Sequence, residues 1–101
     1  MTILAIDAGT TGVTALLVSR DARVVAKGHS ELPQHFPADG WVEHDPNEIW
    51  AATLNSVKQV LESSAIAEHG APTAVGITDQ RETIVLWDRE TGNFAALAWG
   101  T

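Results

Sequence analysis

The chain has 101 residues, which is the size of one ordinary domain. Hydrophobic residues make up 45% of it and charged residues 19%, a composition that is typical of a folded protein and argues against disorder. Thirteen acidic side chains against six basic ones give a formal net charge of −7, which disfavours a partner made of nucleic acid or an anionic membrane surface.

The chain contains no cysteine, which excludes disulfides, a thiolate nucleophile and a Cys-based zinc site. Its start lacks a basic region and reaches Asp7 too early for the apolar stretch of a signal peptide. No apolar run approaches the roughly 20 residues that are needed to span a bilayer. These features predict a soluble, cytoplasmic protein.

The first third of the sequence predicts an antiparallel meander. A short apolar run at residues 3–6 indicates a strand, and the turn formers and hydroxyl residues of 7–12 follow it directly. Residues 13–18 are rich in β-branched residues and leucine, which predicts a second strand. A polar turn then leads to a third predicted strand at 23–28.

An irregular segment at residues 29–45 separates this meander from a helix. Its regular structure is broken by Pro33, Pro37 and Gly40. Because Phe36 and Trp41 need apolar surroundings, we expect an ordered loop in which Trp41 is an anchor.

A helix is predicted over residues 46–63. Asp45 is a suitable N-cap, Pro46 suits the first helical position, and Glu48 stands three residues after the cap. The spacing of four, three and four residues places one apolar stripe on the helix, formed by Trp50, Leu54, Val57 and Leu61. We expect this stripe to face the core, with Trp50 and the strand residue Trp87 as core side chains.

The remaining chain predicts a connection and three strands. Residues 64–72 are small and polar and form the connection, and residues 74–78 form the next strand. The apolar runs at 84–87 and 94–99 enclose a turn with Gly92 and Asn93, which suit positive φ, so they indicate a hairpin. The order of elements predicts an α/β fold with a mixed sheet flanked by helix.

The turn at residues 7–12 has the groups that a polyphosphate site needs. Peptide N–H groups near Gly9 and the hydroxyls of Thr10 and Thr11 suit phosphate oxygens, and Asp7 suits Mg²⁺, directly or through a water molecule. The spacing is not that of a Walker A loop. Taken alone, a hexapeptide of this kind is most often an ordinary hairpin turn.

The polar segment 78–83 suits a polyol. The Arg81 guanidinium donates hydrogen bonds in a fixed fork and the Glu82 carboxylate accepts them, so together they suit neighbouring hydroxyls. Trp99 suits the C–H face of such a ligand, with core packing as its alternative. The alternative for Arg81 and Glu82 is a solvated ion pair in a polar turn.

The other polar clusters are less informative. Glu43, His44 and Asp45 invite a metal site, but consecutive side chains point in different directions and Asp45 already has a role as helix cap. The remaining histidines, His29, His35 and His69, are scattered and indicate no catalytic arrangement.

Read together, these segments resemble the amino-terminal stretch of the glycerol kinases, within the FGGY carbohydrate-kinase family of the actin-like ATPase superfamily. The resemblance runs along the whole chain. It is carried by the motifs Ala5-Ile6-Asp7-Ala8-Gly9-Thr10-Thr11, Gly40-Trp41-Val42-Glu43-His44-Asp45-Pro46 with Glu48-Ile49-Trp50, and Gly76-Ile77-Thr78-Asp79-Gln80-Arg81-Glu82-Thr83.

The resemblance implies a fold and a set of site residues. The fold is an incomplete first domain of the ribonuclease H-like type, with a phosphate hairpin at about 5–14 and a polyol segment at about 78–83. Asp7 would lie near Mg²⁺ and the phosphates of ATP, together with Gly9, Thr10 and Thr11. Arg81, Glu82 and Trp99 would contact glycerol. We expect the two clusters to face a common crevice.

The resemblance also implies an activity for a longer protein. Such kinases transfer the γ-phosphoryl group of MgATP to a terminal hydroxyl, and their catalytic aspartate would lie beyond residue 101. We therefore expect glycerol phosphorylation by the full-length protein and none by this chain alone, which would need the missing carboxyl-terminal part as its partner. The alternatives are a kinase for another polyol or ketose, and a stand-alone, non-catalytic module that binds a polyol or a partner.

Two further expectations follow. Three positions depart from the pattern common in glycerol kinases, namely Ala8, Gly12 and Thr14, and they remove a cation from near the phosphates. Apolar faces left without covering elements lead us to expect that the isolated chain self-associates as a homo-oligomer.

Overall fold

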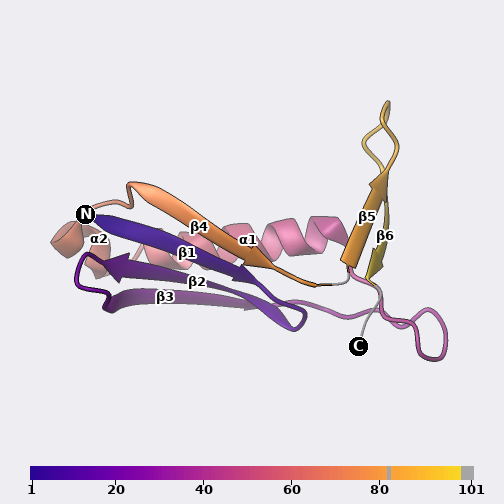
Figure 1. Cartoon of the computed structure of the whole chain (residues 1–101), viewed down its shortest axis with the longest axis horizontal. Helices are drawn as coiled ribbons and strands as arrows, with labels where there is room; N and C mark the ends of the chain where they lie inside the picture. The colour runs from indigo at the N-terminus through magenta and orange to yellow at the C-terminus, as the bar shows by residue number, and fades with distance from the viewer. Residues whose placement is uncertain (82, 99–101) are drawn as a thin grey trace.

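The computed structural model describes residues 1–81 and 83–98. Its main body is a four-stranded sheet with one long helix along one face, and a separate two-stranded hairpin stands off one end (Figure 1). In chain order the elements are β1 (Thr2–Ala8), β2 (Gly12–Ser19), β3 (Val24–Glu31), α1 (Pro46–Leu61), α2 (Ser64–His69), β4 (Ala74–Asp79), β5 (Thr83–Trp87) and β6 (Phe94–Ala98).

The sheet is mixed, as the sequence predicts. Its strand order is β3-β2-β1-β4. β1 pairs antiparallel with β2 and β2 with β3, which confirms the meander, whereas β4 pairs parallel with β1. Because β1 and β4 run in the same direction, their carboxyl ends lie at one edge, where Ala8 is the register partner of Asp79. This edge carries both predicted site segments.

Helix α1 begins where the sequence predicts. An Asp45 carboxylate oxygen accepts a hydrogen bond from the peptide N–H of Asn47 at 2.8 Å, and Pro46 occupies the first turn. The carboxylate of Glu48 lies 3.0 Å from His35 Nε2, so it fastens the preceding loop to the helix. The N-cap therefore marks where α1 begins, and the contact between Glu48 and His35 fastens the loop to its first turn.

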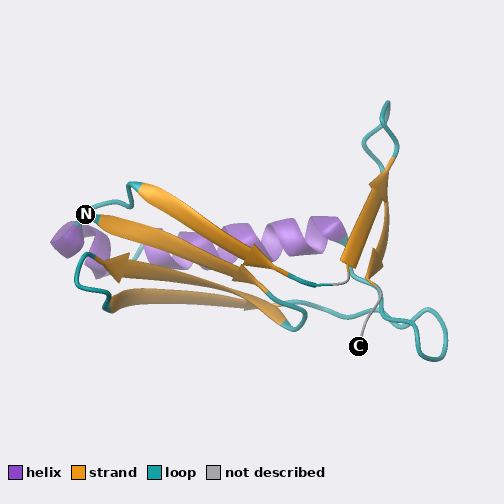
Figure 2. Cartoon of the chain, in the orientation of Figure 1, coloured by secondary structure: helices purple, strands orange, loops and turns teal. Residues whose placement is uncertain are grey.

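Helix α1 covers β2 and β3 and completes the core (Figure 2). Gly28 in β3 permits the close approach, because a methyl group there would overlap the carbonyl oxygen of Ser56. The core consists of small and medium apolar side chains: Leu4, Ile6, Val13, Ala15, Leu17, Leu32, Ala52, Val60 and Ala65.

The predicted core face of the helix is wrong. The residues of α1 that are buried are Ala52, Ser56 and Val60, whereas Trp50 is 62% exposed and Leu54 and Leu61 are also exposed. Of the predicted stripe, only Val57 packs against the core, and it is partly buried. At about 100° per residue, the predicted stripe lies about 120° around the helix from the buried face. The backbones of α1 and β3 come too close for large side chains, so the small residues face the sheet.

A second helix was not predicted. Residues 64–69 form α2, which follows Ser63 as N-cap and buries Ala65 against the core. With only six residues, this helix is too short to display an apolar period, so the sequence suggested a plain connection. No helix in the described part of the chain is long and apolar enough to cross a membrane.

The loop between β3 and α1 is closed by main-chain hydrogen bonds. His35 and Glu43 each donate a peptide N–H to the other's carbonyl oxygen at 2.8 Å, which agrees with an ordered loop. Phe36 and Trp41 are nevertheless exposed, so the expectation that they pack, with Trp41 as an anchor, is wrong. Backbone hydrogen bonds hold this loop in place of an aromatic cluster.

The last two described strands form the predicted hairpin. β5 and β6 pair antiparallel from Thr83 with Ala98 to Trp87 with Phe94, and Gly92 has the positive φ that its turn requires. Trp87 is 64% exposed, which contradicts the prediction that it is a core residue. The hairpin leaves the sheet, so this indole has no opposite layer to enter (Figure 1).

Candidate functional site: the hairpin loop and the end of β4

The predicted phosphate site is a tight loop of residues 9–11 between β1 and β2. The peptide N–H of Gly9 donates to the carbonyl oxygen of Gly12 at 3.0 Å and closes the turn. Thr10 and Thr11 at its tip are exposed. We call residues 9–11 the hairpin loop below.

Three carbonyl oxygens of the hairpin loop are held by other segments. The carbonyl of Gly9 accepts from Gln80 Nε2 at 3.0 Å, that of Thr10 from Gln34 Nε2 at 3.1 Å, and that of Thr11 from the peptide N–H of Leu32 at 3.0 Å. The donors come from the end of β4 and from the loop after β3. The hairpin loop is therefore fixed from two sides.

This anchoring leaves the donors of the tip for a ligand. Among the residues that the structure describes, neither the peptide N–H nor the hydroxyl group of Thr10 or Thr11 donates a hydrogen bond. Exposed N–H and O–H groups next to a glycine suit the oxygens of an anion, because a tight loop aims successive donors outward. The residues present thus fit a phosphate group.

Asp7 stands at the end of β1, next to this loop. It is exposed, and the alternation of β1 places it on the face opposite the buried Leu4 and Ile6. Its register partners are Thr14 on β2 and Thr78 on β4. An exposed carboxylate beside donors that suit a phosphate group also suits a magnesium ion, directly or through water.

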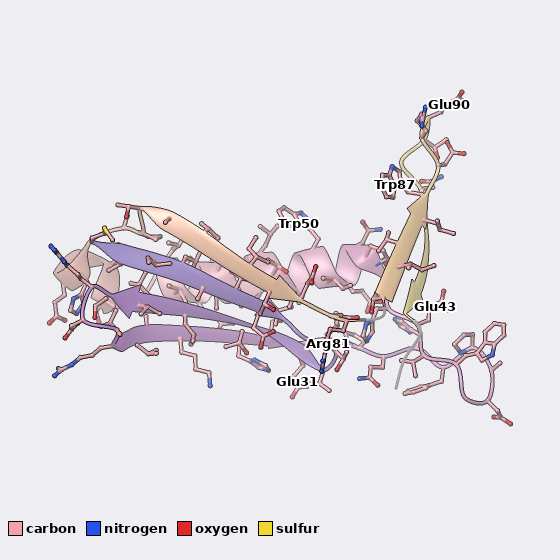
Figure 3. All side chains as sticks on the ribbon, viewed as in Figure 1. Glu31, Glu43, Trp50, Arg81, Trp87 and Glu90 are labelled. Atoms are coloured by element: carbon pink, nitrogen blue, oxygen red, sulfur yellow. The ribbon has the colours of Figure 1, made fainter. Side chains whose placement is uncertain are left out.

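The predicted polyol segment begins where β4 ends. Gln80 follows the last residue of the strand and binds the hairpin loop, so Arg81 is one residue away from that contact. Arg81 is exposed, and Figure 3 shows it at the end of the sheet that carries the β1–β2 turn. Glu82 and Trp99, the other predicted polyol contacts, lie outside the described residues.

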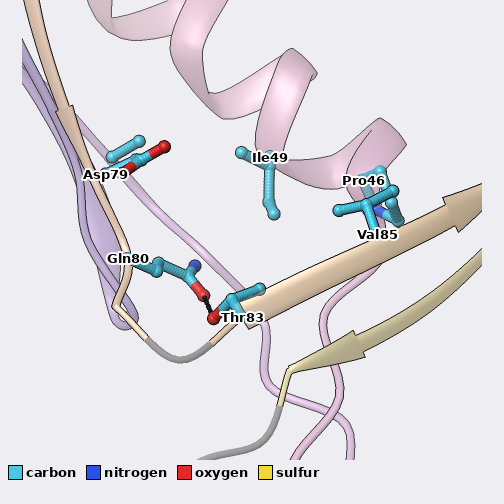
Figure 4. Close-up of a pocket in the computed structure, with 7 residues that line it drawn as sticks. Pro46, Ile49, Asp79, Gln80, Thr83 and Val85 are labelled. Atoms are coloured by element: carbon cyan, nitrogen blue, oxygen red, sulfur yellow. Dashed lines mark hydrogen bonds between the residues drawn. The ribbon is translucent and has the colours of Figure 1, made fainter.

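A pocket of about 250 Å³ opens beside this edge. It lies between the start of α1, the end of β4 and the start of β5 (Figure 4), and its lining residues are Ala8, Pro46, Ile49, Asp79, Gln80, Thr83 and Val85. Both site segments contribute to its walls, but Arg81, Thr10 and Thr11 do not line it. The structure thus brings the two segments together at one edge, while the side chains of Thr10, Thr11 and Arg81, which are predicted to contact ligands, lie outside this hollow.

Sequence reasoning missed two side chains at this edge. Gln80 bonds to the hairpin loop and to Thr83, and His44 is buried beside it with Nδ1 3.0 Å from Gln80 Nε2. Gln80 stood inside a motif that the sequence singled out, but a contact across 71 positions has no local signal. The residues on either side of His44, which the sequence offered with it as a metal site, make other contacts. Asp45 caps α1, and Glu43 pairs with His35 through the main chain.

Comparison with known proteins identifies the family. The model of the family described as "FGGY family of carbohydrate kinases, N-terminal domain" matches residues 2–99 of this chain. A glycerol kinase from Agrobacterium fabrum is 50% identical over 99 residues, which cover 96% of this chain and 20% of that protein. The chain therefore spans about a fifth of the length of the curated relatives that it matches.

Solved structures share the fold. A crystal structure of Plasmodium falciparum glycerol kinase with ADP has a TM-score of 0.79 and 29% identity, over 97% of this chain and 20% of that one. A xylulose kinase from Brucella ovis has a TM-score of 0.85 and 28% identity over the same shares. The mixed sheet with α1 is thus a part of the first domain of an actin-like ATPase fold, and the chain belongs to the FGGY family of carbohydrate kinases.

Proposed function

We propose that the whole protein of which this sequence forms the amino-terminal part transfers the γ-phosphoryl group of MgATP to a terminal hydroxyl of glycerol, which yields glycerol 3-phosphate. The observation that carries the proposal is the hydrogen bond from Gln80 Nε2 to the Gly9 carbonyl. It joins the phosphate segment to the polyol segment at one sheet edge, and phosphoryl transfer requires donor and acceptor to be held close together.

The nucleotide side of the site rests on the hairpin loop. The exposed N–H and hydroxyl groups of Thr10 and Thr11 would bind phosphate oxygens, beside the glycine at position 9. Asp7 would hold Mg²⁺, directly or through its water. When bound, the metal ion neutralises charge on the phosphates, which supports in-line transfer. None of Ala8, Gly12 and Thr14 carries a positive charge. The cationic side chains that balance the phosphate charge alongside Mg²⁺ therefore have to come from other parts of the protein.

The polyol side rests on Arg81, with Glu82 and Trp99 assigned by the family resemblance. A guanidinium donates to two oxygens at once, which suits the neighbouring hydroxyls of a triol. Eight curated relatives that are 46–51% identical to this chain are all named glycerol kinases, which favours glycerol over a ketose.

This chain alone is not expected to catalyse the reaction. The aspartate that would deprotonate the glycerol hydroxyl is expected beyond residue 101, and the relatives are about five times as long. Phosphoryl transfer needs both a general base and the second domain of the kinase, which this chain does not include.

A hybrid enzyme tests the proposal. This chain replaces the segment of the Agrobacterium fabrum glycerol kinase that it matches, and a coupled assay measures turnover with MgATP and glycerol. We expect turnover with glycerol, little with xylulose, a raised KM for glycerol in Arg81→Ala, and none for the isolated chain. A hybrid that unfolds cooperatively but turns over no glycerol would overturn the proposal.

A second measurement covers the case in which the hybrid does not fold. Glycerol is titrated into the isolated, ¹⁵N-labelled chain, and amide shifts are followed by NMR. Shifts confined to residues near Arg81 support a polyol site, and their loss in Arg81→Ala would assign them to its guanidinium. Glycerol-saturable shifts without turnover in a folded hybrid would favour the non-catalytic binding module.

A further inference from the structure

His44 is buried to an unusual degree for a loop histidine. It is 2% exposed, although the loop around it carries exposed aromatic residues. Its Nε2 is fully buried and has no hydrogen-bond partner among the described residues. Burying an unpaired polar atom costs free energy, and an apolar side chain of similar size would avoid that cost. The imidazole thus calls for an explanation other than stability.

The contacts of Gln80 define the state of this imidazole. The amide nitrogen of Gln80 lies 3.0 Å from the Gly9 carbonyl and 3.0 Å from His44 Nδ1, and its oxygen lies 2.9 Å from the Thr83 hydroxyl and 3.2 Å from the same Nδ1. Nδ1 lies closer to the amide nitrogen than to the amide oxygen, and a hydrogen on Nδ1 would face a hydrogen of the amide. With Nδ1 as an acceptor, the two amide hydrogens serve two acceptors and the oxygen accepts from the hydroxyl. Nδ1 then accepts, so the hydrogen of the neutral imidazole is on Nε2.

This network connects both segments of the site to the start of α1. His44 precedes Asp45, whose carboxylate caps α1, so the imidazole is held at the start of the longest helix. Through Gln80 it contacts the hairpin loop and the first residue of β5. The amide plane of Gln80 is held on both sides, and the residue that follows it is Arg81.

We propose that His44 is a positioning residue: its Nδ1 orients the Gln80 amide, which in turn sets the spacing between the hairpin loop and Arg81. The inference rests on the proposed kinase function and deepens it, since it adds a residue that touches neither substrate. A side chain that fixes this spacing acts on the nucleotide and on the polyol together, because displacing one segment misaligns both reactants.

Two substitutions in the hybrid enzyme separate this role from a structural one. His44→Leu fills the space but cannot bond to Gln80, whereas His44→Asn keeps a polar atom near the position of Nδ1. We expect His44→Leu to lower kcat/KM for both substrates by about 10- to 100-fold, and His44→Asn to restore most of the loss. His69→Leu, on α2 and away from this edge, is the matched control and should leave both values unchanged.

A spectroscopic measurement tests the proposal without any substitution. Side-chain ¹⁵N shifts of histidine in the unsubstituted hybrid should show His44 with a bare Nδ1 and a protonated Nε2. A protonated Nδ1 would overturn the proposal, and so would a folded His44→Leu hybrid with unchanged kinetics for both substrates. Absence of turnover in the folded, unsubstituted hybrid would instead count against the kinase function itself.

Discussion

Gly28 shows how one residue sets the distance between helix and sheet. It is buried in β3, and any side chain there would meet the carbonyl oxygen of Ser56 in α1. Because the oxygen belongs to the backbone of α1 and a Cβ is bonded directly to the backbone of β3, neither atom can move without displacing a whole element. The same contact explains why small residues form the buried face of the helix.

We predict that Gly28→Ala destabilises the fold by about 1–3 kcal/mol or more, because it forces α1 away from β3. The free energy of unfolding in urea measures the effect. Gly76→Ala in β4 is the matched control, since a methyl group there meets nothing within 4 Å, and it should change stability by less than about 0.5 kcal/mol. Equal stabilities for the two variants would contradict the described packing.

At the scale of the elements, the sequence predicted those features that depend on residues close together in the chain. A short apolar run and a segment rich in β-branched residues predicted the first two strands of the meander, and Asp45 and Pro46 predicted the start of α1. The orientation of α1 could not be predicted, because the helix has a face of large apolar residues and one of small residues. The choice depends on Gly28, which is distant in sequence and had no recognised role. Helix α2 could not be predicted because it is too short to display an apolar period.

The hydrogen bonds in the turn of the β5–β6 hairpin predict that its stability depends on pH. The peptide N–H groups of Thr91 and Glu90 donate to a carboxylate oxygen of Asp88 at 3.0 and 2.8 Å, and they hold the pKa of Asp88 below its ordinary value. A lowered pKa means that the charged carboxylate stabilises the turn above the unfolded pKa, and that this contribution is lost as pH falls through the folded pKa.

NMR can follow this transition. We expect the amide shifts of Glu90 and Thr91 to change on acidification with a midpoint below the ordinary pKa of aspartate, and we expect Asp88→Asn to abolish the change. A midpoint at or above the ordinary pKa would show that the two hydrogen bonds are absent in solution.

At the scale of the whole molecule, one sheet face is only partly covered. Val75 and Ile77 of β4 are the register partners of the core residues Leu4 and Ile6, so they share their face of the sheet. Helix α1 packs mainly on β2 and β3, and Ile77 is 71% exposed. β4 is also an edge strand of the described sheet. Exposed edges and apolar patches promote association.

We predict that the isolated chain self-associates through this surface. Sedimentation at increasing concentration should show species larger than a monomer, and Ile77→Thr should shift the distribution toward the monomer. Val24→Thr, a similarly exposed position on the opposite edge strand β3, is the control and should have little effect. A monomer at all concentrations would show that the uncovered face does not drive association.

The candidate site could be predicted only in part, because it is assembled from distant segments. The composition of the hairpin loop and of segment 78–83 pointed to phosphate and polyol chemistry residue by residue. Their meeting at one edge depends on the parallel pairing of β1 with β4, and their spacing depends on Gln80 and His44, which are 36 positions apart. Only the folded chain shows which amide reaches which carbonyl.

A crystal structure of the hybrid enzyme with MgADP and glycerol would test the central claim most directly. The account predicts that phosphate oxygens lie within hydrogen-bond distance of the N–H groups of Thr10 and Thr11, and that glycerol hydroxyls bond to Arg81 at the same sheet edge. Nucleotide or glycerol bound elsewhere, with the hairpin loop and Arg81 touching neither ligand, would contradict it.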